Sequence, residues 1–311
     1  MQPVTDVPIA VPTYADRPVT KVPNWHGLVT LDVLFNNLTT GLFICSALAE
    51  LLAPADFGQV VQLAYPLALL LLIADLVCLV LDLGDPWRFH HMLRVWKPNS
   101  PMSLGTWCLS AYAVPLTVLA TLSLFPDLSA GHQRLRVAIL VVGLVPALGA
   151  ALYKGVLFST TSQPGWRDAR WLGGYLVNSA LTLGAAELLM MAVVAGQGGA
   201  IAMLRRALLL LLAFNLMALV ALVLDLRSVL PRSRGVVMLL GLGVLSILGG
   251  LVLPFLLLLS QGSIRLMVAG SSIIVAAALI RAELVTLPHR LERTERAGQA
   301  GATVDLRIVQ N

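Results

Sequence analysis

Long apolar runs alternate with short polar segments along most of the chain. Eight runs reach the roughly 20 residues that a helix needs to cross a bilayer: 28–52, 62–82, 103–125, 136–158, 171–195, 204–226, 235–259 and 264–285. Because a membrane helix satisfies its own backbone hydrogen bonds, these runs predict helices rather than strands. We therefore predict an all-α polytopic membrane protein with eight transmembrane helices.

Composition supports the same class. Of 311 residues, 58% are hydrophobic and 12% are charged, and the mean hydropathy is +0.86. A soluble protein of this length could not bury so much apolar surface. The net charge of +5 lies in short loops between apolar runs, which does not indicate a nucleic-acid partner.

A short internal repeat divides the chain. Leu76–Leu83 matches Leu219–Leu226 at seven of eight positions, 143 residues apart, and Leu38–Gly41 echoes Leu181–Gly184 at the same offset. Equal offsets in equivalent spans predict two parallel four-helix bundles. The expected organisation is a polar N-terminal segment, a first four-helix bundle, a second four-helix bundle and a charged C-terminal tail, over residues 1–27, 28–158, 159–285 and 286–311.

The loop between the second and third spans is the most distinctive segment. It reads Asp82-Leu-Gly-Asp-Pro-Trp-Arg-Phe89 and then Ser100-Pro-Met-Ser-Leu-Gly-Thr-Trp107. These two blocks resemble the signature of the NrfD/PsrC family, membrane subunits of polysulfide-reductase-type molybdoenzyme complexes. Asp85 stands where that family has a basic residue.

The resemblance spans about residues 28 to 285 and implies a function. It implies an integral membrane subunit that anchors a molybdopterin and iron–sulfur oxidoreductase and exchanges electrons with the quinone pool of a respiratory chain. The implied partners are a ferredoxin-like iron–sulfur subunit on the signature-loop face and a molybdopterin catalytic subunit beyond it. The implied cofactor is menaquinone or ubiquinone, and the implied location is the prokaryotic inner membrane.

Polar residues in the first two spans are candidates for a ligand site. Asp32 and Asn36 are four residues apart and share a helix face, as do Asp75 and Asp82 at a spacing of seven. A charged residue at bilayer depth costs about 2.5–3.5 kcal/mol on insertion scales, so these groups should face the bundle interior. Interhelical hydrogen bonds that only hold the bundle together are the alternative.

The fourth predicted span ends at the same membrane face as the signature loop. Tyr153-Lys154-Gly155 resembles the family's Y-T-G motif, in which the tyrosine hydrogen-bonds a quinone oxygen, with Lys154 replacing the threonine. An ordinary interfacial tyrosine is the alternative. We expect the quinone-binding residues to converge in the first bundle: Tyr153, Asp82, His91, Asn36 and Asp32. The family often has Gly-Gly where Asn36 and Asn37 stand.

Other polar residues fit proton transfer or docking. Asp75 and Glu187 lie inside spans, and His90 is a histidine, the residue type best suited to proton exchange, so these three are candidates for proton transfer. Glu50, Glu187 and Asn215 could instead pair with one another. In the signature loop, the candidates for partner docking are Arg88, Arg94, Lys97 and Trp87.

No metal site, haem site or iron–sulfur cluster is predicted in this chain. Cys45, Cys78 and Cys108 form no ligand cluster, and no predicted span contains a histidine. Electrons must therefore pass to or from a separate protein.

Charge predicts the orientation. Sixteen of the 21 basic residues fall on the face that holds both termini and the signature loop, which predicts that this face is cytoplasmic. Many complexes of the family that this chain resembles hold their catalytic subunits on the outer side, so this prediction is in tension with the resemblance.

Two other functions remain open. Parallel repeats and buried carboxylates also suit a solute or ion transporter, although no paired broken helices occur at matching positions. A passive membrane anchor without its own quinone site is the second alternative.

Overall fold

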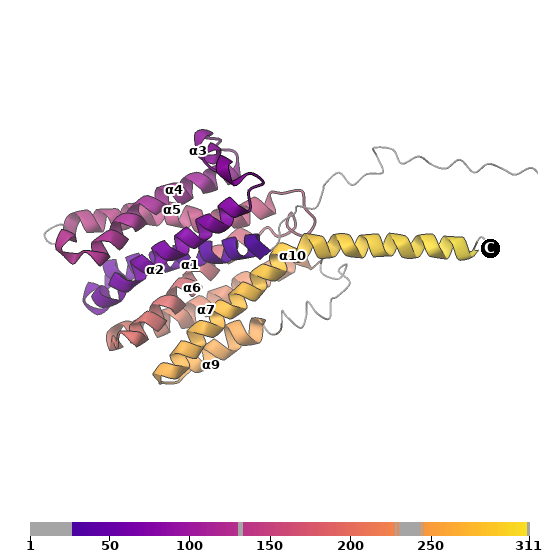
Figure 1. The fold of residues 1–311 in the computed structure, drawn as a ribbon. Helices are drawn as coiled ribbons and strands as arrows, with labels where there is room; N and C mark the ends of the chain where they lie inside the picture. The colour runs from indigo at the N-terminus through magenta and orange to yellow at the C-terminus, as the bar shows by residue number, and fades with distance from the viewer. Residues whose placement is uncertain (1–26, 130–132, 228, 230–243, 245, 310–311) are drawn as a thin grey trace, which may run out of the picture.

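The computed structural model describes residues 27–129, 133–227, 229, 244 and 246–309 (Figure 1). Within these residues the regular secondary structure is helical. The long helices are α1 (Gly27–Leu52), α2 (Pro54–Leu81), α4 (Pro101–Leu124), α5 (Gln133–Ser159), α6 (Leu172–Val194), α7 (Gly198–Leu226) and α10 (Ser263–Val309). The short ones are η2 (Pro86–Arg88), α3 (His91–Arg94), η3 (Pro126–Ser129), the π-helix η5 (Leu248–Val252) and α9 (Leu253–Leu259).

Seven of the described helices are long and apolar enough to cross a membrane, so the chain is a multi-pass membrane protein. They match seven of the predicted spans within a few residues, except that α2 and α7 begin earlier and α10 ends later. The predicted span 235–259 lies partly outside the described residues, which include only its end, as η5 and α9. The count of eight and the division into two four-helix bundles therefore stay predictions.

Helices α1 and α6 form the centre of the bundle. They bury 72% and 61% of their apolar windows, whereas the other spans bury a third or less. Gly41 and Gly184 meet where the two helices cross, and a Cβ on either glycine would overlap the backbone of the other helix. Lipid is as apolar as a leucine side chain, so close backbone approach, rather than hydrophobicity, holds such a crossing together.

The signature loop is shaped by its own serines and proline. Ser100 is the N-cap of α4, where its side chain accepts a hydrogen bond from the Ser103 amide, and Pro101 begins the helix with its preset φ. The Ser103 hydroxyl donates to the Val95 carbonyl and accepts from the Lys97 amide, both at 3.0 Å. The Ser-Pro-Met-Ser block therefore starts α4 and fixes the loop before it.

Helix α10 continues well beyond its predicted span, and Figure 1 shows it projecting from the bundle as a single helix. Pro288 lies inside it and lacks an amide hydrogen, so the Leu284 carbonyl four residues earlier loses its helical donor. The Trp166 indole replaces that donor at 2.7 Å and is almost fully buried. The loop between α5 and α6 is thereby anchored to α10.

Candidate functional site

A charged cluster lies inside the first four long helices. The Lys154 ammonium, from α5, is 2.8 Å from Asp32 Oδ1 on α1 and 2.8 Å from Asp75 Oδ1 on α2. It also donates to the Asp32 carbonyl at 2.8 Å. All three side chains are buried, and Asp75 has no exposed surface. Three helices are thus tied together by one ammonium group and two carboxylates.

Asn36 extends this cluster on α1. Its amide nitrogen donates to Asp75 Oδ2 at 3.3 Å, one turn from Asp32. Its carbonyl oxygen is buried and has no hydrogen-bond partner among the described residues. A buried polar atom without a partner is costly, so the cluster offers an unused acceptor to a bound group.

Tyr153 lies beside the ammonium group, and its ring packs against the signature motif. Lys154 Nζ is 5.6 Å from the centre of its ring. On the other side, the ring packs against Gly105 of α4 so closely that a Cβ at that position would overlap it. The glycine of the second signature block therefore makes room for the tyrosine of the Tyr-Lys-Gly segment.

These contacts bring together only some of the residues that we predict for quinone binding. Asp32, Asn36 and Tyr153 lie in or beside the cluster, together with Asp75, which the sequence predicts for proton transfer. Asp82 is the half-buried C-cap of α2, seven residues beyond Asp75 and thus about 10 Å farther along the helix axis. Its role in quinone binding stays a prediction.

The two loop histidines lie outside the cluster's described contacts. His90 and His91 are exposed, with ring centres 4.3 Å apart. His90 Nδ1 is 3.0 Å from the Trp87 carbonyl, and His91 Nδ1 is 3.4 Å from an Arg94 nitrogen. Their predicted roles, quinone binding for His91 and proton transfer for His90, are not supported by a contact with Tyr153 or Asp32.

The residues predicted for docking are on the surface. Trp87 is 85% exposed, and Arg88, Arg94 and Lys97 are exposed as well. Arg88 pairs with Asp85 at 3.1 Å, the residue that replaces the family's basic one. The exposed loop is available to a partner, and its use remains a proposal.

The other buried acids have separate surroundings. Glu50 pairs with Arg136 and accepts a hydrogen bond from the Tyr65 hydroxyl at 2.7 Å. Glu187 is buried near Cys45, and its Oε2 has no hydrogen-bond partner among the described residues. Asn215 bonds to Asn178 across α6 and α7, so the mutual pairing left open for Glu50, Glu187 and Asn215 is not what the structure shows.

Sequence reasoning missed two buried cations. It counted Lys154 and Arg281 among the residues of the basic face, yet they are 3% and 0% exposed. Arg281 Nη2 donates to Asn37 Oδ1 at 2.6 Å and to Ser179 Oγ at 3.1 Å. For Lys154, the sequence signal was the pair Asp32 and Asp75, because two carboxylates at bilayer depth need a cation beside them.

Several residues that differ from the motifs of the resembled family take part in these buried contacts. Asn36 stands where the signature resemblance often implies a glycine and Lys154 where it implies a threonine, and both bond to Asp75. Asn37, which replaces the second glycine, bonds to Arg281. The two asparagines on α1 are therefore matched by polar partners on α2 and α10.

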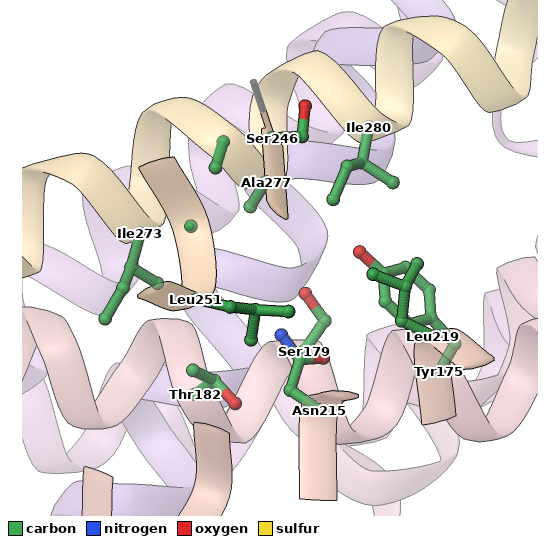
Figure 2. Close-up of a pocket in the computed structure, with 12 residues that line it drawn as sticks. Tyr175, Ser179, Thr182, Asn215, Leu219, Ser246, Leu251, Ile273, Ala277 and Ile280 are labelled. Carbon is green, nitrogen blue, oxygen red and sulfur yellow. The ribbon is translucent and has the colours of Figure 1, made fainter. Parts of the chain in front are cut away.

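No group of three or more histidine, cysteine or acidic side chains in the described part of the chain could hold a metal ion. A cavity lies between α6, α7, η5 and α10 (Figure 2). A second, open hollow lies along one face of α10.

Comparison with known proteins agrees with this architecture. The sequence pattern of the family described as polysulphide reductase, NrfD, matches residues 20–285. The chain is also similar to a selenate reductase subunit of Mesobacillus selenatarsenatis, with 28% identity over 101 residues. That match covers 32% of this chain and 23% of the relative. Since the family pattern covers most of the chain, the protein belongs to the NrfD family of polysulphide reductase.

Proposed function

We propose that this chain is the membrane subunit of a molybdopterin and iron–sulfur reductase complex, which it anchors and connects to the quinone pool. The observation that carries this proposal is the buried cluster of Lys154, Asp32, Asp75 and Asn36 beside Tyr153. Tyr153 packs on Gly105 of the signature motif, which supports assigning the motif and the cluster to one site. Family membership and the relative's name, a reductase subunit, are consistent with a reductase complex.

The residues of this site fit a quinone. A quinone takes up two electrons and two protons when it is reduced, and a quinol returns them when it is oxidised. The Tyr153 hydroxyl can donate a hydrogen bond to a quinone carbonyl, and the unpartnered Asn36 oxygen can accept one from a quinol hydroxyl. Aromatic rings and aliphatic spans supply the apolar surroundings that such a ligand needs.

Proton transfer is the second task of the site. Asp32 and Asp75 are two carboxylates that share one ammonium group, so the cluster can gain a proton and remain compensated by Lys154. Asp82 lies at the signature-loop end of the same helix as Asp75, about 10 Å farther along the axis by helical rise. We place the proton route between the site and the membrane surface along this face of α2, with the exposed His90 as a further carrier.

The signature loop is proposed as the docking surface for the iron–sulfur subunit. It carries exposed Trp87, Arg88, Arg94 and Lys97 and leads into the start of α4, where Gly105 contacts Tyr153. Exposed aromatic and arginine side chains are enriched in protein interfaces. This arrangement brings an incoming electron carrier close to the proposed quinone site.

Quinol-dependent electron transfer by the intact complex tests the proposal. Tyr153→Phe, Asp75→Asn and Asp82→Asn should each lower turnover while the complex still assembles. Tyr65→Phe and Asp127→Asn are matched controls, because they alter a buried tyrosine outside the cluster and an exposed acid. Full turnover in all three test variants would exclude this site and favour a passive anchor. Solute uptake by vesicles containing the chain alone would favour the transporter.

A further inference from the structure

The contacts between helices repeat across the α1–α6 crossing. Helix α1 packs on α2 and α5, and α6 correspondingly packs on α7 and α10. Helix α5 contacts α6, and α10 correspondingly contacts α1. Gly41 and Gly184, which the sequence repeat pairs, touch each other at the centre. A reciprocal contact between equivalent positions is what a two-fold relation produces.

This correspondence pairs the buried cluster with a second set of residues. The offset of 143 residues places Tyr175 at the position of Asp32 and Ser179 at the position of Asn36. The buried cation that α5 supplies as Lys154 is supplied by α10 as Arg281. Lys154 bonds to Asp32 on α1, and Arg281 bonds to Ser179 on α6, one turn beyond the position that corresponds to Asp32. The two cations therefore occupy comparable places.

Their charge compensation differs. Lys154 contacts two carboxylates. Arg281 has no exposed surface, and its described acceptors are neutral: Asn37 Oδ1, Ser179 Oγ and the Ala277 carbonyl. Its Nε has no partner among the described residues. Fully buried arginines are almost always paired with an anion, because an uncompensated charge in a low-dielectric interior is costly.

Sequence limits where a carboxylate partner could come from. No ion pair of Arg281 occurs within the described chain, where Asp32 and Asp75 bind Lys154 instead. Residues 230–243, which follow α7, contain no aspartate or glutamate. Within the described residues and the segment 230–243, no carboxylate compensates Arg281, and a bound anion is a simple source of compensation.

A polar cavity is lined by two residues that accept hydrogen bonds from Arg281, namely Ser179 and Ala277. Its volume is about 20 Å³, enough for roughly one water-sized group. Five of its lining residues carry hydroxyl or amide groups: Tyr175, Ser179, Thr182, Asn215 and Ser246. Figure 2 shows the Tyr175, Ser179 and Asn215 side chains pointing into the space between α10 and the helices facing it. Ser179 connects the cavity to Arg281, since it lines one and accepts from the other.

The lining presents hydrogen-bond donors. Asn215 uses its carbonyl oxygen to accept from Asn178, which leaves its amide hydrogens for the cavity. The hydroxyls of Tyr175 and Ser246 are donors as well. Donors that surround a small cavity beside an uncompensated cation are the features of an anion site.

We propose that this cavity binds a small inorganic anion of about the size of a water molecule, with chloride as the simplest case. Arg281 supplies the charge, while Asn215, Ser246 and Tyr175 supply hydrogen bonds. The anion compensates Arg281 at the position where, in the other half, Asp32 and Asp75 compensate Lys154. This proposal concerns the second half of the chain and does not depend on quinone binding.

Thermal unfolding of the purified full-length chain tests it without an activity assay. The melting temperature is measured in sodium gluconate, chloride and bromide at equal ionic strength. Wild type should gain roughly 2–4 °C in a saturable response to either halide. Arg281→Gln should lose that response, whereas Arg206→Gln, an exposed arginine on α7, should keep it.

A second variant decides the question even if Arg281→Gln does not fold. Asn215→Asp introduces a carboxylate into the cavity, so it should melt in gluconate near the wild-type chloride value and no longer respond to halide. Absence of a halide response in wild type would overturn the proposal. An undiminished response in Arg281→Gln or in Asn215→Asp would overturn it as well.

Discussion

The ammonium group of Lys154 lies 2.8 Å from the Asp75 carboxylate, and neither residue is appreciably exposed. Asp75 receives a second bond from Asn36, at 3.3 Å. The contact joins the end of α5 to the middle of α2 through α1, where Lys154 also meets Asp32. One lysine is thus the common partner of Asp32 and Asp75, which gives it a structural and an electrostatic role at once.

Lys154→Met should destabilise the protein strongly. The variant leaves two buried carboxylates without their cation, and breaking a buried ion pair in this way costs about 3–5 kcal/mol. Thermal unfolding of the purified chain measures the loss. Adding Asp75→Asn should recover part of it, because one uncompensated charge is removed. A single variant as stable as wild type would show that the ion pair does not hold these helices together.

Gly105→Ala should impair the proposed quinone site more than the fold. The new methyl group overlaps the Tyr153 ring, which must move, and misplacement of a reacting group can lower turnover roughly 10–100-fold. Quinol oxidation or quinone reduction by the assembled complex is the readout. Gly58→Ala is the control, since nothing lies within 4 Å of a Cβ at that exposed position of α2. Equal turnover in both variants would argue against a site at Tyr153.

Gly41→Ala should separate the two central helices. A Cβ there overlaps the Ala180 carbonyl, which is backbone and cannot rotate away. We expect a lower yield of folded protein and a lower melting temperature by several degrees, since overpacking costs about 1–3 kcal/mol. Gly249→Ala, which meets nothing within 4 Å, should express normally. Unchanged expression and melting of Gly41→Ala would contradict the close crossing.

Trp166→Phe should loosen the junction between the α5–α6 loop and α10. It removes the indole donor from the Leu284 carbonyl, which Pro288 cannot replace. An unsatisfied buried carbonyl costs about 1–3 kcal/mol. Hydrogen exchange in residues 284–291 should increase, and the melting temperature should fall. Trp171→Phe, at a largely exposed tryptophan, provides the comparison, and the same exchange in both variants would rule out the proposed anchor.

Much of the fold could be predicted from the sequence, because the requirements of a membrane helix are local. Span length is fixed by bilayer thickness, so the apolar runs predicted the seven long helices within a few residues except at the starts of α2 and α7 and the end of α10. Ser100 and Pro101 predict the start of α4 for an equally local reason, namely capping and a preset φ. The two signature blocks led to the family that the comparison then established.

Tertiary structure alone decided which polar side chains lie inside the bundle. A lysine or arginine near a helix end can extend to the headgroups or turn inward, and the chain sequence is the same in both cases. Lys154 and Arg281 turn inward because neighbouring helices present acceptors at their depth: Asp32 and Asp75 for one, Asn37 and Ser179 for the other. The sequence determined the spans and the family, whereas the packing of α1 against α6 decided where the buried charges meet.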